Sequence, residues 1–267
     1  MEGNTKLLNT NSVAIVGSRK CSMYGWKQAM QFGKELSING ICVVSGMAVG
    51  IDKAAHIGAK YGWGKTIAVL GGGFNDIYPE ENKELFYEII ENGGCIITEY
   101  APEEKTKGAN FPKRNRIISG ISMGTLVIEA AKRSGSLITA RLTKSQKKPL
   151  FCIPSNLGTS KGIGTNELIK NGAILTTSVN DIFTELKLEK RVREQTIKKD
   201  IKVDKCYQNV YNVLENMPLT VDKISLKCKC SIAKVNQVLT MLELKGFVKS
   251  YPGNQFALME DNEEFDK

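Results

Sequence analysis

The sequence predicts an α/β protein, with a doubly wound, mainly parallel sheet over residues 1–183 and a small C-terminal winged-helix domain over residues 207–259. Three observations support this prediction. Short apolar runs alternate with helix-length amphipathic stretches through the first 183 residues, and several of these runs end in glycine. The alternation is then replaced by three helical stretches and a hairpin.

The predicted strands are short and often β-branched, as strands buried on both faces of a parallel sheet are. They cover residues 13–16, 41–44, 67–70, 95–98, 126–128, 150–153 and 173–175. Helices are expected between them at residues 25–37, 52–61, 82–91, 113–119, 137–145 and 166–170. Gly17, Gly46 and the run Gly71-Gly72-Gly73 directly follow strands. We therefore expect tight turns, and a ligand site, at the carboxyl edge of the sheet.

Residues 184–206 are rich in charge and poor in large apolar side chains. They are interpreted as an exposed helix or linker, with direct phosphate contact as the alternative. The winged-helix domain follows, with helices expected over 207–216, 221–226 and 232–244 and a hairpin formed by 247–251 and 255–258. Residues 260–267 are acidic and are expected to form a solvated tail, the alternative being a nucleic-acid mimic that competes for the protein's own site.

Composition narrows the class of function. The 267 residues carry 37 Lys and Arg against 28 Asp and Glu, a net charge of +9 that indicates a polyanionic partner. No apolar run reaches the ~18 residues of a bilayer span and no signal peptide is evident, so we expect a cytoplasmic protein without membrane contact. Seven cysteines without a framework spacing suit a reducing compartment, and a single histidine leaves no material for a His-rich metal site.

The first strand runs into Gly17-Ser18-Arg19, which has the character of a phosphate cradle. Glycine lets backbone amides approach a ligand, the Ser18 hydroxyl donates, and the Arg19 guanidinium can bind a phosphate through two donors. The helix expected from residue 25 points its positive end toward the same place. The dinucleotide fingerprint G-x-G-x-x-G is absent here, and a purely structural turn is the alternative.

The segment Phe111-Pro112-Lys113-Arg114-Asn115-Arg116 places three cations and an amide beside an aromatic ring, where a helix is expected to begin. Cations at a helix N-terminus oppose the helix dipole, which favours a bound anion that relieves the conflict. Charges that follow a phosphate backbone and a ring that stacks on a base suit single-stranded nucleic acid. A solvated basic turn is the alternative.

Roles are also expected for four further motifs of the α/β domain. Asp52 is expected to cap the helix after the second strand. His56 is expected to be a packed, hydrogen-bonded residue, because no second histidine or nucleophile pair accompanies it. Three consecutive glycines at 71–73 predict the close approach of a backbone or a ligand. Ser136 is expected to cap the helix from residue 137.

In the winged-helix domain, Cys228 and Cys230 are assigned to packing, because no second pair of zinc ligands lies near them in the sequence. Lys234, Asn236 and Gln237 lie on the polar side of the third helix. They are expected either to read base edges or to contact a protein.

These motifs, taken in order, resemble the DNA-processing protein A family, also called Smf. The matching blocks are V-A-I-V-G-S-R at 13–19, S-G-M-A-V-G-I-D at 45–52, G-G-G-F-N-D-I-Y-P at 71–79, T-E-Y at 98–100, F-P-K-R-N-R-I-I-S-G at 111–120, S-G-S-L-I-T-A at 134–140 and N-E-L-I-K-N-G-A at 166–173. They span residues 13–183. The C-terminal domain is similar to the family's accessory winged helix.

The resemblance implies an extended Rossmann-like domain that binds single-stranded DNA, forms a homodimer and helps to load the recombinase RecA in natural transformation. The residues themselves show no catalytic pair, since Asp52 and Glu129 are single carboxylates, and no enzymatic activity, cofactor or metal is expected. The DNA-binding residues carried over by the matching motifs are Gly17, Ser18, Arg19, Phe111, Lys113, Arg114, Asn115 and Arg116, and Lys170 is added to this set.

The sequence departs from the family pattern in two ways. Many members have a small helical domain before the Rossmann-like core, and the core here begins near residue 13, so that module is expected to be absent. Pro154-Ser155 stands where Pro-Gly is usual, and a different backbone shape is expected for this turn.

Two other classes of function stay open at this point. A nucleotide phosphoribohydrolase-like enzyme would use Gly71-Gly72-Gly73 for binding and Glu129 for acid–base chemistry, although the P-G-G-x-G-T-x-x-E block of such enzymes is missing. A transcription regulator would use the winged helix on a specific duplex and the α/β domain as a sensor.

Overall fold

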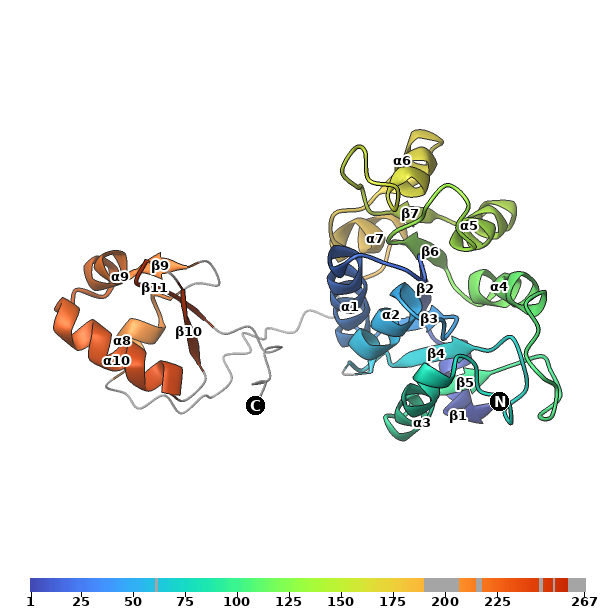
Figure 1. The fold of residues 1–267 in the computed structure, drawn as a ribbon, viewed down its shortest axis with the longest axis horizontal. Helices are drawn as coiled ribbons and strands as arrows, with labels where there is room; N and C mark the ends of the chain where they lie inside the picture. Colours follow the sequence, from blue (N-terminus) through green and yellow to red (C-terminus); the bar gives the residue numbers. More distant parts are fainter. Residues whose placement is uncertain (61, 190–206, 215–217, 245–246, 252, 259–267) are drawn as a thin grey trace. The chain divides into compact units, whose positions relative to one another are not determined.

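The structure is a computed structural model, and it describes residues 1–60, 62–189, 207–214, 218–244, 247–251 and 253–258. The chain divides into two units, Met1–Val192 and Arg193–Lys267, which are described separately (Figure 1). Most of the expected linker at 184–206 and the whole of the expected tail at 260–267 lie outside the described residues.

The first unit is built on an eight-stranded sheet with the order β1-β5-β4-β3-β2-β6-β7-β8 (Figure 1). The strands are β1 Glu2–Gly3, β2 Ser12–Val16, β3 Cys42–Ser45, β4 Thr66–Val69, β5 Cys95–Ile97, β6 Gly124–Val127, β7 Leu150–Cys152 and β8 Ile174–Leu175. Every neighbouring pair is parallel except β1 with β5. The mainly parallel, doubly wound sheet predicted from the sequence is therefore confirmed.

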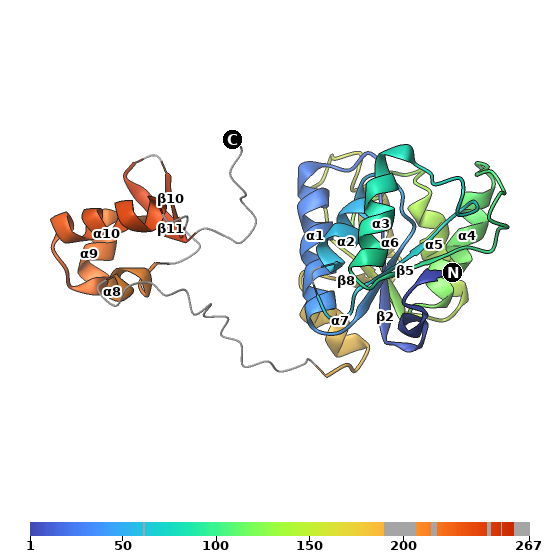
Figure 2. The same cartoon turned by 90° about the horizontal axis from the view of Figure 1, so that it is seen from below.

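Helices cover both faces of this sheet (Figure 2). On one face lie α1 Met23–Ile38, α2 Ile51–Ala59, α3 Lys83–Glu91 and α7 Val179–Glu185, and on the other lie α4 Asn110–Gly120, α5 Ser136–Ser145 and α6 Ile163–Lys170. The described part of this unit also contains two short 3-10 helices, η1 Thr5–Asn9 and η2 Glu80–Asn82. Alternate residues of β2 supply the two cores, since Val13 and Ile15 pack on the α1 side and Ala14 and Val16 on the α4 side.

Several element positions differ from the predictions. The boundary expected after residue 183 falls inside α7, whose Ile182 and Phe183 are buried in the core of the first unit. Asp52 does not cap α2, because the N-cap is Gly50 and Asp52 is the second residue of the helix. Helix α5 begins at Ser136 itself, with Gly135 as its N-cap, so the expected Ser136 cap is also wrong.

The second unit contains α8 Gln208–Tyr211, α9 Val221–Cys228 and α10 Ile232–Leu244, with a three-stranded sheet of order β10-β11-β9. The strands are β9 Leu219–Thr220, β10 Val248–Tyr251 and β11 Gln255–Leu258. Ile224, Val235, Leu239 and Leu242 form its buried core. Three helices and an antiparallel hairpin confirm the predicted winged helix, and β9 is an addition that pairs with β11.

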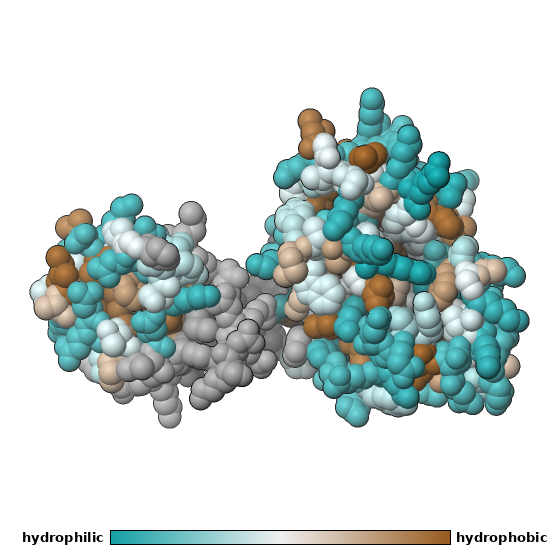
Figure 3. Space-filling view, viewed as in Figure 1, coloured by the Kyte–Doolittle hydropathy of each residue, from teal (hydrophilic) through white to brown (hydrophobic). Residues whose placement is uncertain are grey.

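The face of the first unit drawn in Figure 3 is mainly hydrophilic, with hydrophobic residues scattered over it. Among the described residues, none of the helices combines the length and the apolar character that a bilayer crossing requires.

Candidate functional site

A cavity of about 1000 Å³ opens at the carboxyl edge of the sheet. It is lined by the turn after β2 and by the segment after β6. These two strands are neighbours, and the connections leave them in opposite directions along the sheet, toward β3 and toward β7 (Figure 1). The cavity therefore lies at the topological switch point, where doubly wound folds bind their ligands.

The turn after β2 is fixed from two sides. A side chain at Gly17 would meet the Ile51 side chain at 2.6 Å, and one at Gly50, whose φ is +82°, would meet the Ser18 carbonyl oxygen at 2.4 Å. The Ser18 amide donates to the Glu129 carbonyl at 2.8 Å, and the Ile51 amide donates to the Ser18 carbonyl at 3.3 Å. The backbone that carries Arg19 is thus held in one position, and the exposed Arg19 side chain projects from it.

An aromatic pair forms part of the cavity wall. The Phe111 and Tyr78 ring centroids are 5.5 Å apart, and the Tyr78 side chain is half exposed. The Arg19 guanidinium carbon lies 4.9 Å from the Phe111 centroid, within the range of a cation–π contact. A cation and two ring surfaces therefore meet at one place in the cavity.

Arg114 is buried at 3% exposure, which the sequence did not predict. Its Nη1 donates to the Gly46 carbonyl at 2.6 Å and to the Val69 carbonyl, so it joins the ends of β3 and β4 to helix α4. Among the described residues its buried Nε has no hydrogen-bond partner. Burial lowers the pKa of Arg114 to about 10, while the nearby Asp52 carboxylate favours the charged form.

Asp52 is the buried partner of this arginine. Its Oδ2 accepts from the Gly46 amide at 3.1 Å, and only 7% of the residue is exposed. Burial raises the pKa of Asp52 to about 6, and the Arg114 guanidinium acts in the opposite direction. Asp52 and Arg114 are therefore buried opposite charges that act on each other at the wall of the cavity, and Arg114 supports this wall through its bonds to the Gly46 and Val69 carbonyls.

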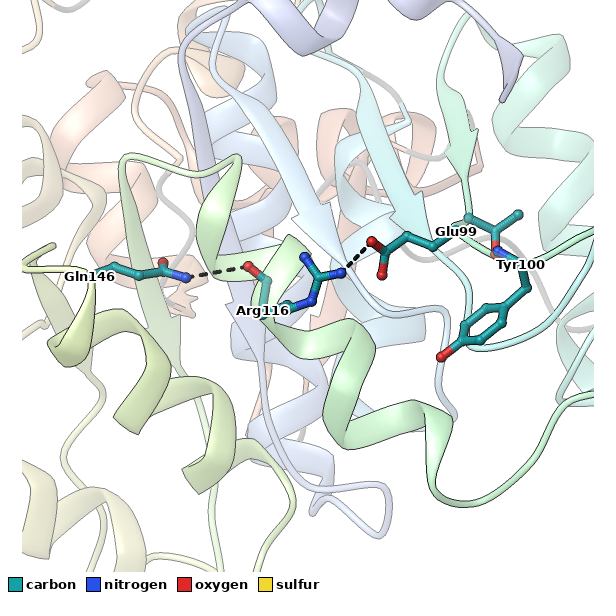
Figure 4. A network of polar contacts seen from close by, with 5 residues as sticks. Glu99, Tyr100, Arg116 and Gln146 are labelled. Carbon is teal, nitrogen blue, oxygen red and sulfur yellow. Dashed lines mark hydrogen bonds and ion pairs between the residues drawn. The ribbon is translucent and has the colours of Figure 1, made fainter.

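Six of the nine predicted site residues line the cavity, namely Gly17, Ser18, Arg19, Phe111, Arg114 and Asn115. The other three lie elsewhere. Lys113 is exposed on α4, and Lys170 is the last residue of α6. The Arg116 guanidinium forms an ion pair with Glu99, and its backbone carbonyl accepts from the Gln146 amide at 3.4 Å (Figure 4).

Three cations outside the predicted set of site residues also line the cavity. They are Lys20, Arg133 and Lys161. Lys20 and Arg133 follow β2 and β6, so the switch-point rule applied to all cations after these strands would have found them. Lys161 comes from the segment between β7 and α6, and nothing in its local sequence marks it. The lining thus holds five cations and the single carboxylate of Asp52.

Other segments of the chain pack so closely against the glycines at 71–73 that a side chain there would collide with them. A side chain at Gly72 would lie 3.0 Å from the Thr106 Cα, and one at Gly73 would lie 2.1 Å from the Ala101 carbonyl oxygen. The predicted close approach is therefore made by the backbone of residues 101–106.

The two groups considered for acid–base chemistry have structural partners. The Thr66 hydroxyl donates to the Val43 carbonyl, so the His56 Nδ1–H donates to Thr66 Oγ1 at 2.7 Å and Nε2 accepts from the Met47 amide at 3.4 Å. Burial lowers the pKa of His56 to about 3, which keeps the ring neutral. The packed role predicted for His56 is confirmed.

Glu129 holds the start of α1. Its Oε2 accepts from the Ser22 amide at 2.8 Å, and its Oε1 accepts from the Ser22 hydroxyl. That hydroxyl in turn accepts from the Gly25 amide at 3.0 Å and caps the helix. Within the part of the chain that the structure describes, no group of three or more His, Cys, Asp or Glu side chains is arranged to hold a metal ion.

In the second unit, Lys234, Asn236 and Gln237 are exposed on α10. Cys228 and Cys230 are partly buried against its hydrophobic core, in agreement with a packing role. In the first unit, Ser155 keeps an ordinary negative φ, and its amide and carbonyl are both bound by the Asn166 side-chain amide.

Comparison with known proteins places this geometry in a family. The family model of DNA recombination-mediator protein A matches residues 1–187, and that of the DprA winged helix domain matches residues 198–254. Protein Smf of Escherichia coli is 42% identical over 186 residues, which are 70% of this chain and 50% of the relative. The DNA processing protein DprA of Streptococcus pneumoniae is 42% identical over 184 residues, 69% of this chain and 64% of the relative.

Solved structures agree with these matches. The crystal structure of Streptococcus pneumoniae DprA superposes with a TM-score of 0.65 at 41% identity and covers 69% of this chain and 64% of its own. The solved structure of Helicobacter pylori DNA processing protein A, described for its single-stranded DNA binding mode, superposes with a TM-score of 0.64 at 34% identity and covers 70% of this chain and 85% of its own. The chain spans between half and two thirds of the length of the two sequence relatives named above. It belongs to the family of DNA recombination-mediator protein A.

Proposed function

We propose that this chain binds single-stranded DNA in the switch-point cavity and acts as a recombination mediator that protects incoming DNA and helps to load RecA. The observation that carries the proposal is the contact of Arg19, on its fixed turn, with the Phe111 ring, which packs beside the half-exposed Tyr78 ring. A phosphate backbone needs cations, and unpaired bases need exposed ring surfaces. The relative from Helicobacter pylori, described as a single-stranded DNA binder, supports the assignment.

The cations divide between two roles in this proposal. Arg19, Lys20, Arg133 and Lys161 neutralise phosphates, because their side chains line the cavity and are exposed or half-buried. Arg114 instead holds the backbone at the ends of β3 and β4, because its guanidinium is already bound to the Gly46 and Val69 carbonyls. Ser18 and Asn115 supply neutral hydrogen bonds. The chain acts as a homodimer in the cytoplasm, without a catalytic step or a cofactor.

A duplex-binding role for the second unit is the second candidate, and the exposed Lys234, Asn236 and Gln237 on α10 favour it. The phosphoribohydrolase alternative receives no such support, because the P-G-G-x-G-T-x-x-E block is missing and the Glu129 carboxylate holds the start of α1 through Ser22.

The proposal is tested by fluorescence anisotropy with a single-stranded oligonucleotide and the matching duplex. We expect tighter binding of the single strand, whatever its sequence. Four neutralised phosphates give a log–log salt slope of about −3, at about −0.7 per phosphate. Arg19→Ala should weaken binding about tenfold and reduce the slope to about −2. Arg141→Ala, an exposed arginine on α5 outside the cavity lining, is the matched control and should bind like wild type.

Two results would overturn the proposal. One is preferential binding of the duplex by the full chain. The other is an Arg19→Ala variant that keeps wild-type affinity and salt dependence.

A further inference from the structure

A second cavity, of about 490 Å³, adjoins the first and shares Lys161 with it. Its wall comes from three places. Ser22 and Tyr24 lie at the start of α1, Glu129 follows β6, and the remaining residues, 154–156 and 159–161, lie between β7 and α6. The half-buried Lys161 thus faces both cavities.

Glu129 gives this cavity a fixed hydrogen-bond acceptor. The residue is 5% exposed, and the Ser22 amide and hydroxyl orient its carboxylate. Each carboxylate oxygen accepts one hydrogen bond from Ser22 and can accept a second. A ligand that enters this cavity therefore meets an oriented acceptor that requires no further reorganisation.

Tyr24 and Lys161 supply the other two parts of a nucleotide site. The Tyr24 side chain is 52% exposed at the wall of the cavity, so its ring can stack on a base. The Lys161 ammonium can neutralise a phosphate at the junction of the two cavities. A phosphate placed against Glu129 instead would be repelled by its carboxylate. The base and not the phosphate is thus the part of a nucleotide that fits beside Glu129.

We propose that the second cavity is a base subsite that holds a nucleotide of the strand bound in the first cavity and prefers bases with an exocyclic amino group. This inference rests on the proposed single-stranded DNA binding. Tyr24 stacks on the base, Glu129 accepts from its amino group, and Lys161 binds the intervening phosphate. Cytosine has this amino group at N4, whereas thymine has a carbonyl oxygen at the corresponding position.

The experiment compares labelled cytosine and thymine homo-oligonucleotides of equal length with the full chain. Wild type should bind the cytosine strand about three- to tenfold more tightly, the factor expected for one added hydrogen bond. Glu129→Gln keeps the shape of the side chain but removes the charge of the acceptor, and it should reduce the preference to less than twofold. The ratio of the two affinities is the measured quantity, because an effect of the substitution on the start of α1 changes the binding of both strands alike.

Because Glu129 also holds the start of α1 through Ser22, a second variant tests the subsite without changing Glu129. Tyr24→Ala should weaken binding of both strands at least fivefold through the lost stacking. The control is Tyr87→Ala on α3, because Tyr87 is exposed to the same degree, 50% against 52%, and lines neither cavity.

The outcomes separate this inference from the function on which it rests. If neither strand binds to wild type, the proposed function fails. If both bind equally, if Glu129→Gln keeps a full preference for cytosine, or if Tyr24→Ala behaves like Tyr87→Ala, the base subsite is wrong while the first cavity stands.

Discussion

The buried pair of Arg114 and Asp52 makes the strongest prediction about the stability of the site. Arg114→Met keeps most of the side-chain volume but leaves the Gly46 and Val69 carbonyls without their donor, and it removes the positive charge that offsets the burial of the Asp52 carboxylate. Leaving a buried charge without the opposite charge that compensates it costs about 3–5 kcal/mol. We expect the free energy of unfolding of the first unit to fall by this amount at pH 8.

The loss should depend on pH, with a sign set by Asp52. Its folded pKa of about 6 lies above the usual 3.8, so the folded state binds the proton more tightly and stability falls as pH rises through this window. The Arg114 charge lowers the pKa of Asp52, so its removal raises this pKa further. Each pKa unit of this rise lowers the free energy of unfolding at pH 8 by about 1.4 kcal/mol. The variant should therefore lose less stability at pH 5, where Asp52 is protonated.

Guanidinium denaturation followed by tryptophan fluorescence measures this loss. Both tryptophans of the chain, Trp26 and Trp63, lie in the first unit, so the signal reports that unit alone. Adding Asp52→Asn to Arg114→Met should restore at least half of the loss, and Arg141→Met serves as the exposed control. A loss below about 1 kcal/mol, or one equal at pH 5 and pH 8, would refute the reasoning.

Three further predictions concern single positions. Arg116→Ala should change the affinity for single-stranded DNA less than twofold, because the Arg116 guanidinium is paired with Glu99 outside the cavity. A tenfold loss of affinity in the same anisotropy assay would show that Arg116 contacts the DNA. Gly50→Ala should destabilise the first unit by about 1–3 kcal/mol, because φ is +82° and the Ser18 carbonyl oxygen lies 2.4 Å from the added carbon; an unchanged midpoint of denaturation would contradict this. His56 stays neutral to about pH 3 when folded but titrates near 6.5 when unfolded, so it contributes stability that is lost as pH falls through this range. Between pH 6.5 and 4 the stability of His56→Gln should therefore fall less than that of wild type, by up to about 1.4 kcal/mol per pH unit; parallel curves would be inconsistent with a buried neutral ring.

The sequence predicted the sheet well because buried parallel strands are continuous apolar runs. All seven predicted strands are present within two residues of their expected ends. The first strand, β1, was missed because Glu2 and Gly3 have no apolar pattern and pair only through their backbone with β5. Helix α7 was missed because it is short and follows a weak strand, yet Ile182 and Phe183 complete the core under α1.

The site was predicted in part: residues marked by a local motif were found, whereas residues whose position depends on contacts distant in sequence were not. Arg19 and Phe111 could be selected because their motifs put a cation at a strand end and a ring beside basic residues. The burial of Arg114 could not, since it depends on carbonyls of Gly46 and Val69, which are distant in sequence. Lys161 reaches the cavity only through the packing of the segment between β7 and α6. The expected Asp52 cap was wrong because Gly50, in a left-handed conformation, begins the helix instead.

The central claim, that single-stranded DNA is bound in the switch-point cavity, is tested most directly by photo-crosslinking. A thymine oligonucleotide that carries one 5-iododeoxyuridine is irradiated with the full chain, and the modified peptide is identified by mass spectrometry. We expect crosslinks at Phe111 or Tyr78, the rings that share the cavity with Arg19, and a marked loss of them in Arg19→Ala. Crosslinks confined to the winged-helix unit would contradict this claim.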